Sequence, residues 1–225
     1  MNCLAIDTST EILSVALSAG DRVYEATRNI GLKHSEILMP LIDSLIREAG
    51  IEPKALNLVI CAKGPGSFTG LRIGMATAKG IAAGAESHIV SVPTLDVIAY
   101  GLTFYDGIVV PVIDAKKKCY YTAFYMGGER ITKYLDVDCH AIMNMLQPYE
   151  KVLLTGPHAP GLYKELPEAC KYVLDPCHKT GRSVHLLELG IRQYETSGPD
   201  VSGDGPLYVR RSEAEISLLD KKDDG

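Results

Sequence analysis

Aspartates at the ends of two apolar segments are the side chains of this sequence best suited to chemistry. Asp7 follows the run CLAI and precedes Thr8 and Ser9, and Asp114 follows VVPVI in the second half of the chain. In a phosphate-binding hairpin, such a carboxylate holds a cation or a water, while backbone N–H groups of the turn contact the phosphates. These four residues are therefore candidate nucleotide-binding groups. The structural alternative is a hairpin turn capped by a strand-end aspartate.

The turn after Asp114 departs from the pattern of an active phosphate clasp. Residues 115–120 read AKKKCY, so lysines stand where glycines are needed. Backbone that approaches a phosphate and adopts positive φ favours glycine, and lysine does not supply such a turn. We therefore expect a solvated basic turn without ATP hydrolysis, and weak nucleotide binding stays open.

The glycine-rich run GPGSFTGLRIG, residues 64–74, has the composition of a phosphate loop but not the spacing. Counted from Gly64, neither GxxxxGK[ST] nor the dinucleotide pattern GxGxxG is satisfied. We expect instead a rigid turn between a strand and a helix over residues 71–85.

Small residues continue along that helix at intervals of four. Each mid-helix glycine costs about 1 kcal/mol relative to alanine, so the repeat needs a compensating gain. A flat stripe permits close packing, either within the chain or against another subunit. The stripe and the apolar side chains of the preceding helix give the candidate interface residues Leu38, Leu41, Leu45, Gly70, Gly74, Ala76, Gly80 and Gly84.

The sequence lacks patterns that hold metals or activate nucleophiles. The six histidines form no HxxxH or HExxH pair, and the six cysteines form no CxxC pair. Cys3, Cys61 and Cys119 lie in apolar, strand-like segments, which favours buried thiols. Ser14 and Ser67 have no His/Asp partner in the sequence. We expect no metal site and no catalytic triad.

Charge and hydropathy argue against further classes. The net charge is −5, whereas an autonomous nucleic-acid-binding protein has a basic face. A subunit that meets RNA only through a partner is compatible with this charge. The N-terminus lacks the basic and apolar regions of a signal peptide, and no apolar run reaches the roughly 20 residues that span a bilayer. We expect a soluble, cytoplasmic protein without membrane contact.

The elements that must position these residues alternate between strands and helices. In the first half, β-rich runs at residues 3–9, 12–19 and 22–29 form a meander. A helix follows over residues 35–49, with Ser35 as N-cap, Pro40 about one turn in and Gly50 just past its end. A strand within 56–64, the helix over 71–85 and a strand within 88–94 complete this half.

The second half repeats this order. A shift of 107 residues matches four pairs: Ile6 with Ile113, Asp7 with Asp114, Ala16 with Ala123, and Gly20 with Gly127. The run up to residue 131 predicts strand, polar turn, strand, glycine turn and strand, so we infer duplication. We predict an α/β protein of two related lobes, residues 1–103 and 104–225, each with a mixed sheet and flanking helices. This is the actin-like ATPase architecture, in which two hairpins clasp a nucleotide across a cleft.

Six motifs together resemble the TsaB (YeaZ) family, the bacterial partner subunits in tRNA threonylcarbamoyladenosine formation. They are AIDTST, KHSEILMPLIDSLI, GPGSFTGLRIGMATAKGIA, SVPTLDVIAYG, PVIDAKKKCYYTAFY and PLYVRR. The resemblance implies an actin-like fold with a degenerate nucleotide site, and no cofactor beyond weak ATP or ADP with Mg²⁺ in the complex. It also implies partners: a TsaD-like catalytic paralogue, a TsaE-like ATPase, tRNA only through the complex, and a second copy when the chain is alone.

The resemblance also bears on single positions. In the catalytic paralogue, the helix after the strand matching HIVSV carries two metal-binding histidines, and the matching positions here are Thr94 and Ile98. Neither side chain replaces imidazole at a metal. In the family, two helices of the N-terminal lobe contact the paralogue or a second copy. The run PLYVRRSEAE, residues 206–215, is a docking tail or an exposed charged terminus.

The resemblance therefore implies a non-catalytic subunit that docks and activates the catalytic paralogue, which in that family transfers a threonylcarbamoyl group to the adenosine beside the anticodon. Two other classes stay open. An ATP-dependent small-metabolite kinase would need ATP turnover, against which the AKKK turn argues. A protease would need a metal pair or a triad that the sequence lacks.

Overall fold

Two mixed β-sheets with the same strand order form the centre of the protein. The computed structural model describes residues 1–31, 33–168, 171–201 and 203–210. The first sheet has the order β3-β2-β1-β4-β5 and the second the order β10-β7-β6-β11-β12. The strands of the first sheet are β1 (Cys3–Asp7), β2 (Ile12–Ala19), β3 (Arg22–Asn29), β4 (Leu58–Ala62) and β5 (His88–Val92). Those of the second path are β6 (Ile108–Lys116), β7 (Cys119–Thr122), β10 (Leu135–Asp138), β11 (Val152–Thr155) and β12 (Tyr172–Leu174).

The strand directions in the two sheets also agree. In the first sheet β1 pairs antiparallel with β2 and parallel with β4. In the second, β6 pairs antiparallel with β7 and parallel with β11. Strands β1 and β6 are therefore equivalent, and Asp7 and Asp114 lie at or near their carboxyl ends. The duplication inferred from the sequence is confirmed at the level of topology.

The internal alignment is wrong within the second strand of each half. Asp7 lies opposite Ser14, but Asp114 lies opposite Tyr120, so the second hairpin is one residue shorter. A single shift therefore cannot align both strands, and Ala16 does not correspond to Ala123.

The second and third strands of the second meander are each interrupted. Strand β7 continues into β8 (Tyr125–Met126) along the same edge of β6, and β9 (Glu129–Arg130) and β10 pair with β8 and β7 in turn. Gly127 and Gly128 form the turn between these two strands, as Gly20 and Asp21 do between β2 and β3, so the predicted glycine turn is confirmed.

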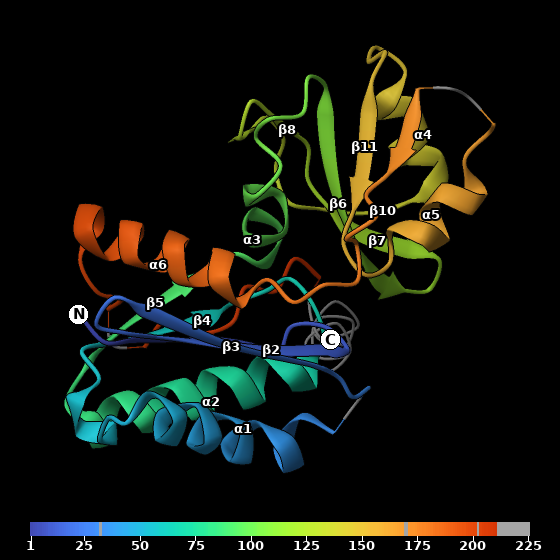
Figure 1. Ribbon diagram of the computed structural model, residues 1–225. Coiled ribbons are helices and arrows are strands. Elements are labelled where there is room, and N and C mark those ends of the chain that lie inside the picture. Colours follow the sequence, from blue (N-terminus) through green and yellow to red (C-terminus); the bar gives the residue numbers. More distant parts are fainter. Residues whose placement is uncertain (32, 169–170, 202, 211–225) are drawn as a thin grey trace, which may run out of the picture.

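Helices cover both faces of each sheet (Figure 1). On the first sheet, α1 (His34–Ala49) and α2 (Phe68–Ala85) pack on one face and α6 (Ser183–Ser197) on the other. On the second, α4 (Cys139–Leu146) and α5 (Ala159–Glu165) pack on one face and α3 (Thr94–Tyr100) on the other. Helix α3 comes from the first half and α6 from the second, so each half supplies one helix to the other half's sheet. A single-turn 3₁₀ helix, η1 (Pro53–Ala55), precedes β4.

Two helix starts differ from the sequence prediction. Helix α1 begins at His34 with Lys33 as its N-cap, so Ser35 lies inside the helix, and Pro40 is also inside it. Helix α2 begins at Phe68, because the Ser67 side chain caps it by accepting a hydrogen bond from the Gly70 N–H at 3.3 Å. The end of α1 is as expected, since Gly50 has φ 67°, the left-handed conformation that ends many helices.

In the part of the chain that the structure describes, no helix has the length and apolarity needed to cross a bilayer.

Candidate functional site

The two strand-end hairpins face each other across a cleft of about 580 Å³. The β1–β2 hairpin contributes Ser9, Thr10 and Glu11, and the β6–β7 hairpin contributes residues 113–116. The start of α2 and His158, just before α5, complete the lining. The sequence-predicted candidates Ser9 and Asp114 therefore meet in one cleft between the sheets.

Asp7 is buried under its own turn. Its Oδ1 accepts hydrogen bonds from the Ser9 N–H at 2.9 Å and from the Ser9 hydroxyl at 2.6 Å. Burial raises the pKa of the Asp7 carboxyl, and the hydrogen bonds from Ser9 only partly oppose this shift. Thr8 points away toward α2, where its hydroxyl donates to the Gly70 carbonyl at 2.8 Å. The Asp7 carboxylate therefore caps its own turn, which was the structural alternative, and it does not line the large cleft.

Glycines at the start of α2 let it pack directly on this turn. A Cβ on Gly66 would overlap the Ser9 carbonyl oxygen, and a Cβ on Gly70 would overlap the Thr8 carbonyl oxygen. A Cβ on Gly74 would overlap the Thr8 hydroxyl. The first part of the glycine-rich run therefore serves close packing within the chain, which was one of the two alternatives left open by the sequence.

The second hairpin adopts positive φ without any glycine. Lys116, Lys117 and Lys118 have φ values of 63°, 55° and 61°. Lys116 pairs with Cys119 across the turn, so Lys117 and Lys118 form a two-residue loop with positive φ at both positions, as in a type I′ turn. The expectation that lysines do not form such a turn was wrong. Left-handed backbone costs roughly 1–2 kcal/mol per non-glycine residue, so this hairpin is strained.

Both carboxylate oxygens of Asp114 are occupied by one lysine. Oδ1 accepts from the Lys116 N–H and Oδ2 from the Lys116 ammonium, each at 2.7 Å. Partial burial acts to raise the pKa of Asp114, but the hydrogen bonds and charge of Lys116 outweigh it and hold the pKa below its ordinary value.

His158, just before α5, reaches across the cleft to the first hairpin. Its Nε2 lies 3.3 Å from a carboxylate oxygen of Glu11 in the first hairpin. Burial lowers the pKa of His158, and the positive charge of Lys116 acts in the same direction, while Glu11 and Asp114 oppose the shift. Sequence reasoning missed this pair, because a lone histidine and a lone glutamate more than 140 positions apart form no motif.

The cleft has room for a nucleotide but no preformed cation site. Both carboxylate oxygens of Asp114 accept hydrogen bonds from Lys116, and one carboxylate oxygen of Asp7 accepts from Ser9. Across the described residues, no group of three or more His, Cys, Asp or Glu side chains could hold a metal ion. The Lys116 ammonium has three donors and gives one to Asp114, so it could still donate to a bound phosphate.

A second, smaller cavity of about 20 Å³ lies behind the first hairpin, with room for a single water. Asp7 and Ser14 line it from the first sheet, and Arg182 lines it from the segment before α6. The Ser14 hydroxyl is buried and has no hydrogen-bond partner among the described residues. A water here would satisfy it.

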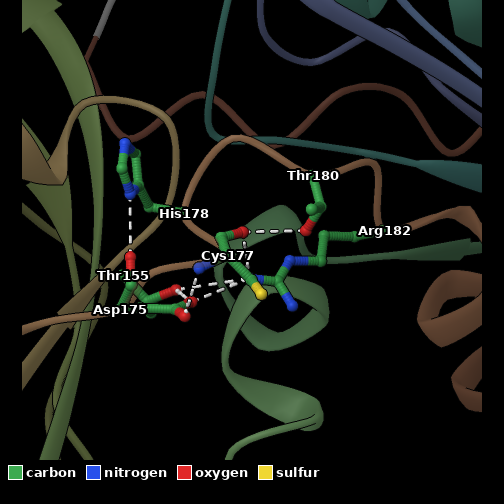
Figure 2. Close-up of polar contacts among 6 residues, drawn as sticks. All are labelled: Thr155, Asp175, Cys177, His178, Thr180 and Arg182. Carbon is green, nitrogen blue, oxygen red and sulfur yellow. Dashed lines mark hydrogen bonds and ion pairs between the residues drawn. The ribbon is translucent and has the colours of Figure 1, made fainter.

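Arg182 belongs to a polar cluster around the buried Asp175, drawn in Figure 2. Asp175 accepts hydrogen bonds from Thr155 at 2.7 Å, from the Cys177 N–H at 2.8 Å and from Arg182 at 3.0 Å. Arg182 also donates to the Cys177 carbonyl at 3.2 Å. Because Asp175 and Arg182 bond to several parts of the segment between them, the cluster fixes the loop from β12 into α6. The sequence gives no sign of this cluster, since its residues have no motif spacing.

The predicted interface residues divide into two groups. Leu38, Leu41 and Leu45 are buried in the core beneath α1, and Gly70 and Gly74 are buried against Thr8. These five do not present a surface to a partner, because the first sheet and its hairpin already cover them. Ala76, Gly80 and Gly84 are exposed on the outer side of α2.

The two positions that the resemblance matched to histidines, Thr94 and Ile98, are used for packing here. Thr94 is buried at the start of α3, and its hydroxyl accepts a hydrogen bond from the Gly64 N–H at 3.1 Å. Ile98 is buried on the same helix within the core of the second sheet. The residues of PLYVRRSEAE from 211 onward lie outside the described part of the chain.

The duplicated sheets, the exchanged helices and the cleft between paired hairpins define an α/β protein with the actin-like ATPase fold. A family model described as "TsaD: tRNA N6-adenosine threonylcarbamoyltransferase" matches residues 28–184. The chain is 30% identical to the tRNA threonylcarbamoyladenosine biosynthesis protein TsaB of Bacillus subtilis (strain 168), over 99% of this chain and 100% of that protein. It therefore belongs to the TsaB (YeaZ) family.

Two further comparisons agree with this assignment. The TsaB protein of Escherichia coli (strain K12) is 36% identical over 57% of each chain. The solved structure of YeaZ from Pseudomonas aeruginosa superposes with a TM-score of 0.78, covering 92% of this chain and 99% of that one at 25% identity.

Proposed function

We propose that this protein is the non-catalytic partner subunit of a tRNA threonylcarbamoyladenosine transfer complex, and that it docks and activates a TsaD-like catalytic paralogue. The observation that carries the proposal is the full-length similarity to a protein named for this biosynthesis. The match to the TsaD family model supports a shared ancestry with the catalytic subunit.

The geometry of the cleft supports a non-catalytic role. Asp114, which would have to hold a cation in an active phosphate clasp, is bonded through both oxygens to Lys116. Thr94 and Ile98 are buried and hold the fold together. These features disfavour the small-metabolite kinase. Weak binding of ATP or ADP with Mg²⁺ in the complex stays a prediction.

The proposed docking surface is the outer side of α1 and α2, which lie next to each other on the first sheet (Figure 1). It contains the exposed small residues Ala76, Gly80 and Gly84 of α2 and the exposed side chain of Met39 of α1. Among the described residues, no atom beyond the helix itself lies within 4 Å of a Cβ placed on Gly80 or Gly84. A partner helix could therefore approach this face closely.

The same surface would serve a second copy when the chain is alone. In the proposed assembly a TsaE-like ATPase joins the complex, tRNA is met only through the complex, and the protein works in the cytoplasm.

Depletion of the protein in its own host tests the function directly. We expect threonylcarbamoyladenosine in bulk tRNA, measured by mass spectrometry of nucleosides, to fall and to recover when the intact gene is supplied in trans. Unchanged levels of the modified nucleoside after verified depletion would refute the proposal.

The docking surface is tested by Gly80→Leu. The leucine has open space in the described structure, so we expect an unchanged melting temperature but loss of co-purification with the catalytic paralogue. Arg192→Leu is the matched control, because it places an exposed leucine on α6, on the opposite face of the same sheet. If the Gly80 variant still co-purifies with the paralogue, or if the control variant loses co-purification equally, the interface does not lie on α2.

A further inference from the structure

The segment after α6 runs back over the first half of the molecule. The Asp200 N–H donates to the carbonyl of Ile89 at 2.9 Å. Ile89 belongs to β5, the edge strand of the first sheet. Further along, the Asp204 carbonyl accepts from Lys79 of α2 at 2.5 Å. The Leu207 N–H donates to the Lys63 carbonyl at 2.6 Å. This segment is therefore anchored on the first sheet and its helix by main-chain and side-chain bonds.

Tyr208 continues these contacts at the start of α2. Its ring lies 4.8 Å from that of Phe68, and its hydroxyl accepts from Arg72 at 3.2 Å. The Arg72 guanidinium in turn lies 3.8 Å above the Phe68 ring. Phe68 also lines the cleft between the hairpins, so the segment reaches the mouth of the cleft from the side of the first sheet.

Two residues later the chain binds the second sheet. Arg210 makes a two-pronged ion pair with Asp136 of β10, at 2.5 and 2.6 Å, and its third nitrogen donates to the Ala115 carbonyl at 2.8 Å. Bidentate arginine–carboxylate pairs are geometrically specific and stronger than neutral hydrogen bonds. Both side chains are largely shielded, with exposed fractions of 27% and 15%.

The two groups that Arg210 binds belong to the wall of the cleft. Ala115 lines it directly, next to the strained lysine turn. Asp136 is the register partner of Tyr121, which also lines it. Residues 206–210 thus connect Lys63 and Phe68 on one side of the cleft to Ala115 and Asp136 on the other.

We propose that residues 206–210 form a latch, closed by Arg210 on Asp136 and Ala115, that sets how far the two sheets open around the cleft. The covalent connections between the sheets run through α3 and α6, which contact each other and can act as a hinge. A device that fixes a hinged cleft needs a second attachment away from the hinge. The ion pair at Arg210 supplies it, whether or not the protein acts in tRNA modification.

Hydrogen exchange on the full-length chain tests whether the latch holds both walls. In Arg210→Ala we expect about tenfold faster exchange of the Leu207 amide and of the amides in residues 115–122, with α1 unchanged. Arg47→Ala is the matched control, because it removes an exposed ion pair with Asp43 within α1. Asp136→Ala should accelerate exchange at the same amides. The double variant should exchange no faster than either single variant, because both substitutions remove the same ion pair.

The opening itself is measured as a distance distribution. Spin labels on noncanonical residues at the exposed positions Glu48 of α1 and Lys164 of α5 report on the two halves. In Arg210→Ala we expect a broader distribution with a longer mean, and in Arg210→Lys an intermediate one, because lysine keeps the charge but not the two-pronged geometry. Exchange equal to that of the Arg47 control, additive effects of the two latch substitutions, or an unchanged distribution would each overturn the proposal.

Discussion

At the scale of single residues, Asp7 and Asp114 occupy equivalent places and have opposite electrostatic surroundings. Burial dominates at Asp7 and raises its pKa, while hydrogen bonds and charge from Lys116 lower that of Asp114. The raised pKa means that Asp7 lowers the stability of the fold at neutral pH, whereas the lowered pKa means that Asp114 raises it. The two equivalent aspartates therefore differ in their surroundings although they hold the same place in the fold.

Asp7→Asn should therefore stabilise the protein. A carboxyl whose pKa is raised binds more protons in the folded than in the unfolded state, so stability falls as pH rises above the ordinary value of 3.8. Asparagine keeps an oxygen for Ser9 and carries no charge. We expect a melting temperature higher by about 2–4 °C at pH 8, as ~1 kcal/mol gives in a chain of this size. The gain should shrink as pH falls toward 4.

Asp114→Asn should behave in the opposite way. Its lowered pKa contributes stability above pH 3.8 that is lost as pH falls through the folded-state pKa. The variant should therefore melt lower than the parent at pH 8, by about 1–2 °C given the partial exposure of the pair. The difference should vanish in acid. Shifts of the same sign for both asparagine variants would contradict the assigned surroundings.

At the scale of elements, α2 carries two kinds of glycine on its two sides. Gly70 and Gly74 permit contact with the first hairpin, whereas a Cβ added to Gly80 or Gly84 would have no described neighbour within 4 Å. Only the first pair has a contact inside the described chain that offsets its cost to the helix. The second pair still needs a reason, and the proposed docking surface is one.

Two alanine substitutions separate these roles. Gly70→Ala should destabilise the protein by about 1–3 kcal/mol, because its Cβ meets a backbone oxygen that cannot rotate away. Gly84→Ala should stabilise it by about 0.5–1 kcal/mol through helix propensity. Chemical denaturation of the isolated protein measures both. Equal effects of the two substitutions would show that the glycines do not differ in their surroundings.

The sequence was sufficient for most elements because their signals are local. Alternating and continuous apolar runs located the strands of both sheets, and Gly50 located the end of α1. What failed depends on contacts between distant segments. The one-residue difference in length between the two hairpins cannot be read locally, because it shows only in the pairing of the strands. Burial of Leu38 and Gly70 likewise follows from the sheet and hairpin that cover them, and the positive φ of the lysines follows from the pairing of the flanking strands.

At the scale of the whole molecule, the exchange of α3 and α6 ties the two halves together. Leu186 and Leu187 of α6 pack with Ala5 and Ile60 of the first sheet. Leu95 and Ile98 of α3 pack in the core of the second sheet. A division of the chain between residues 103 and 104 separates the two sheets. It also separates α3 from the second sheet, on which α3 packs, and α6 from the first sheet, on which α6 packs.

A fragment of residues 1–103 should therefore not fold cooperatively. Without α6, one face of its sheet exposes apolar side chains that the intact protein buries, which favours a collapsed or aggregated state. We expect a broad thermal transition by circular dichroism. Fusion of residues 183–197 through a flexible linker should restore a sharp one. Cooperative unfolding of the unmodified fragment would contradict this view and support an independent first lobe.

The exchanged helices also order events during synthesis. The strands of the first sheet have all been translated by Val92, but the helix that covers one of their faces is complete only at Ser197. At a synthesis rate of about 5–20 residues per second, this face stays exposed for roughly 5–20 s before α6 is complete. The nascent chain therefore passes through a stage in which the first sheet is complete but the apolar face that α6 covers is still exposed. We expect a ribosome-associated chaperone to bind the nascent chain at this face.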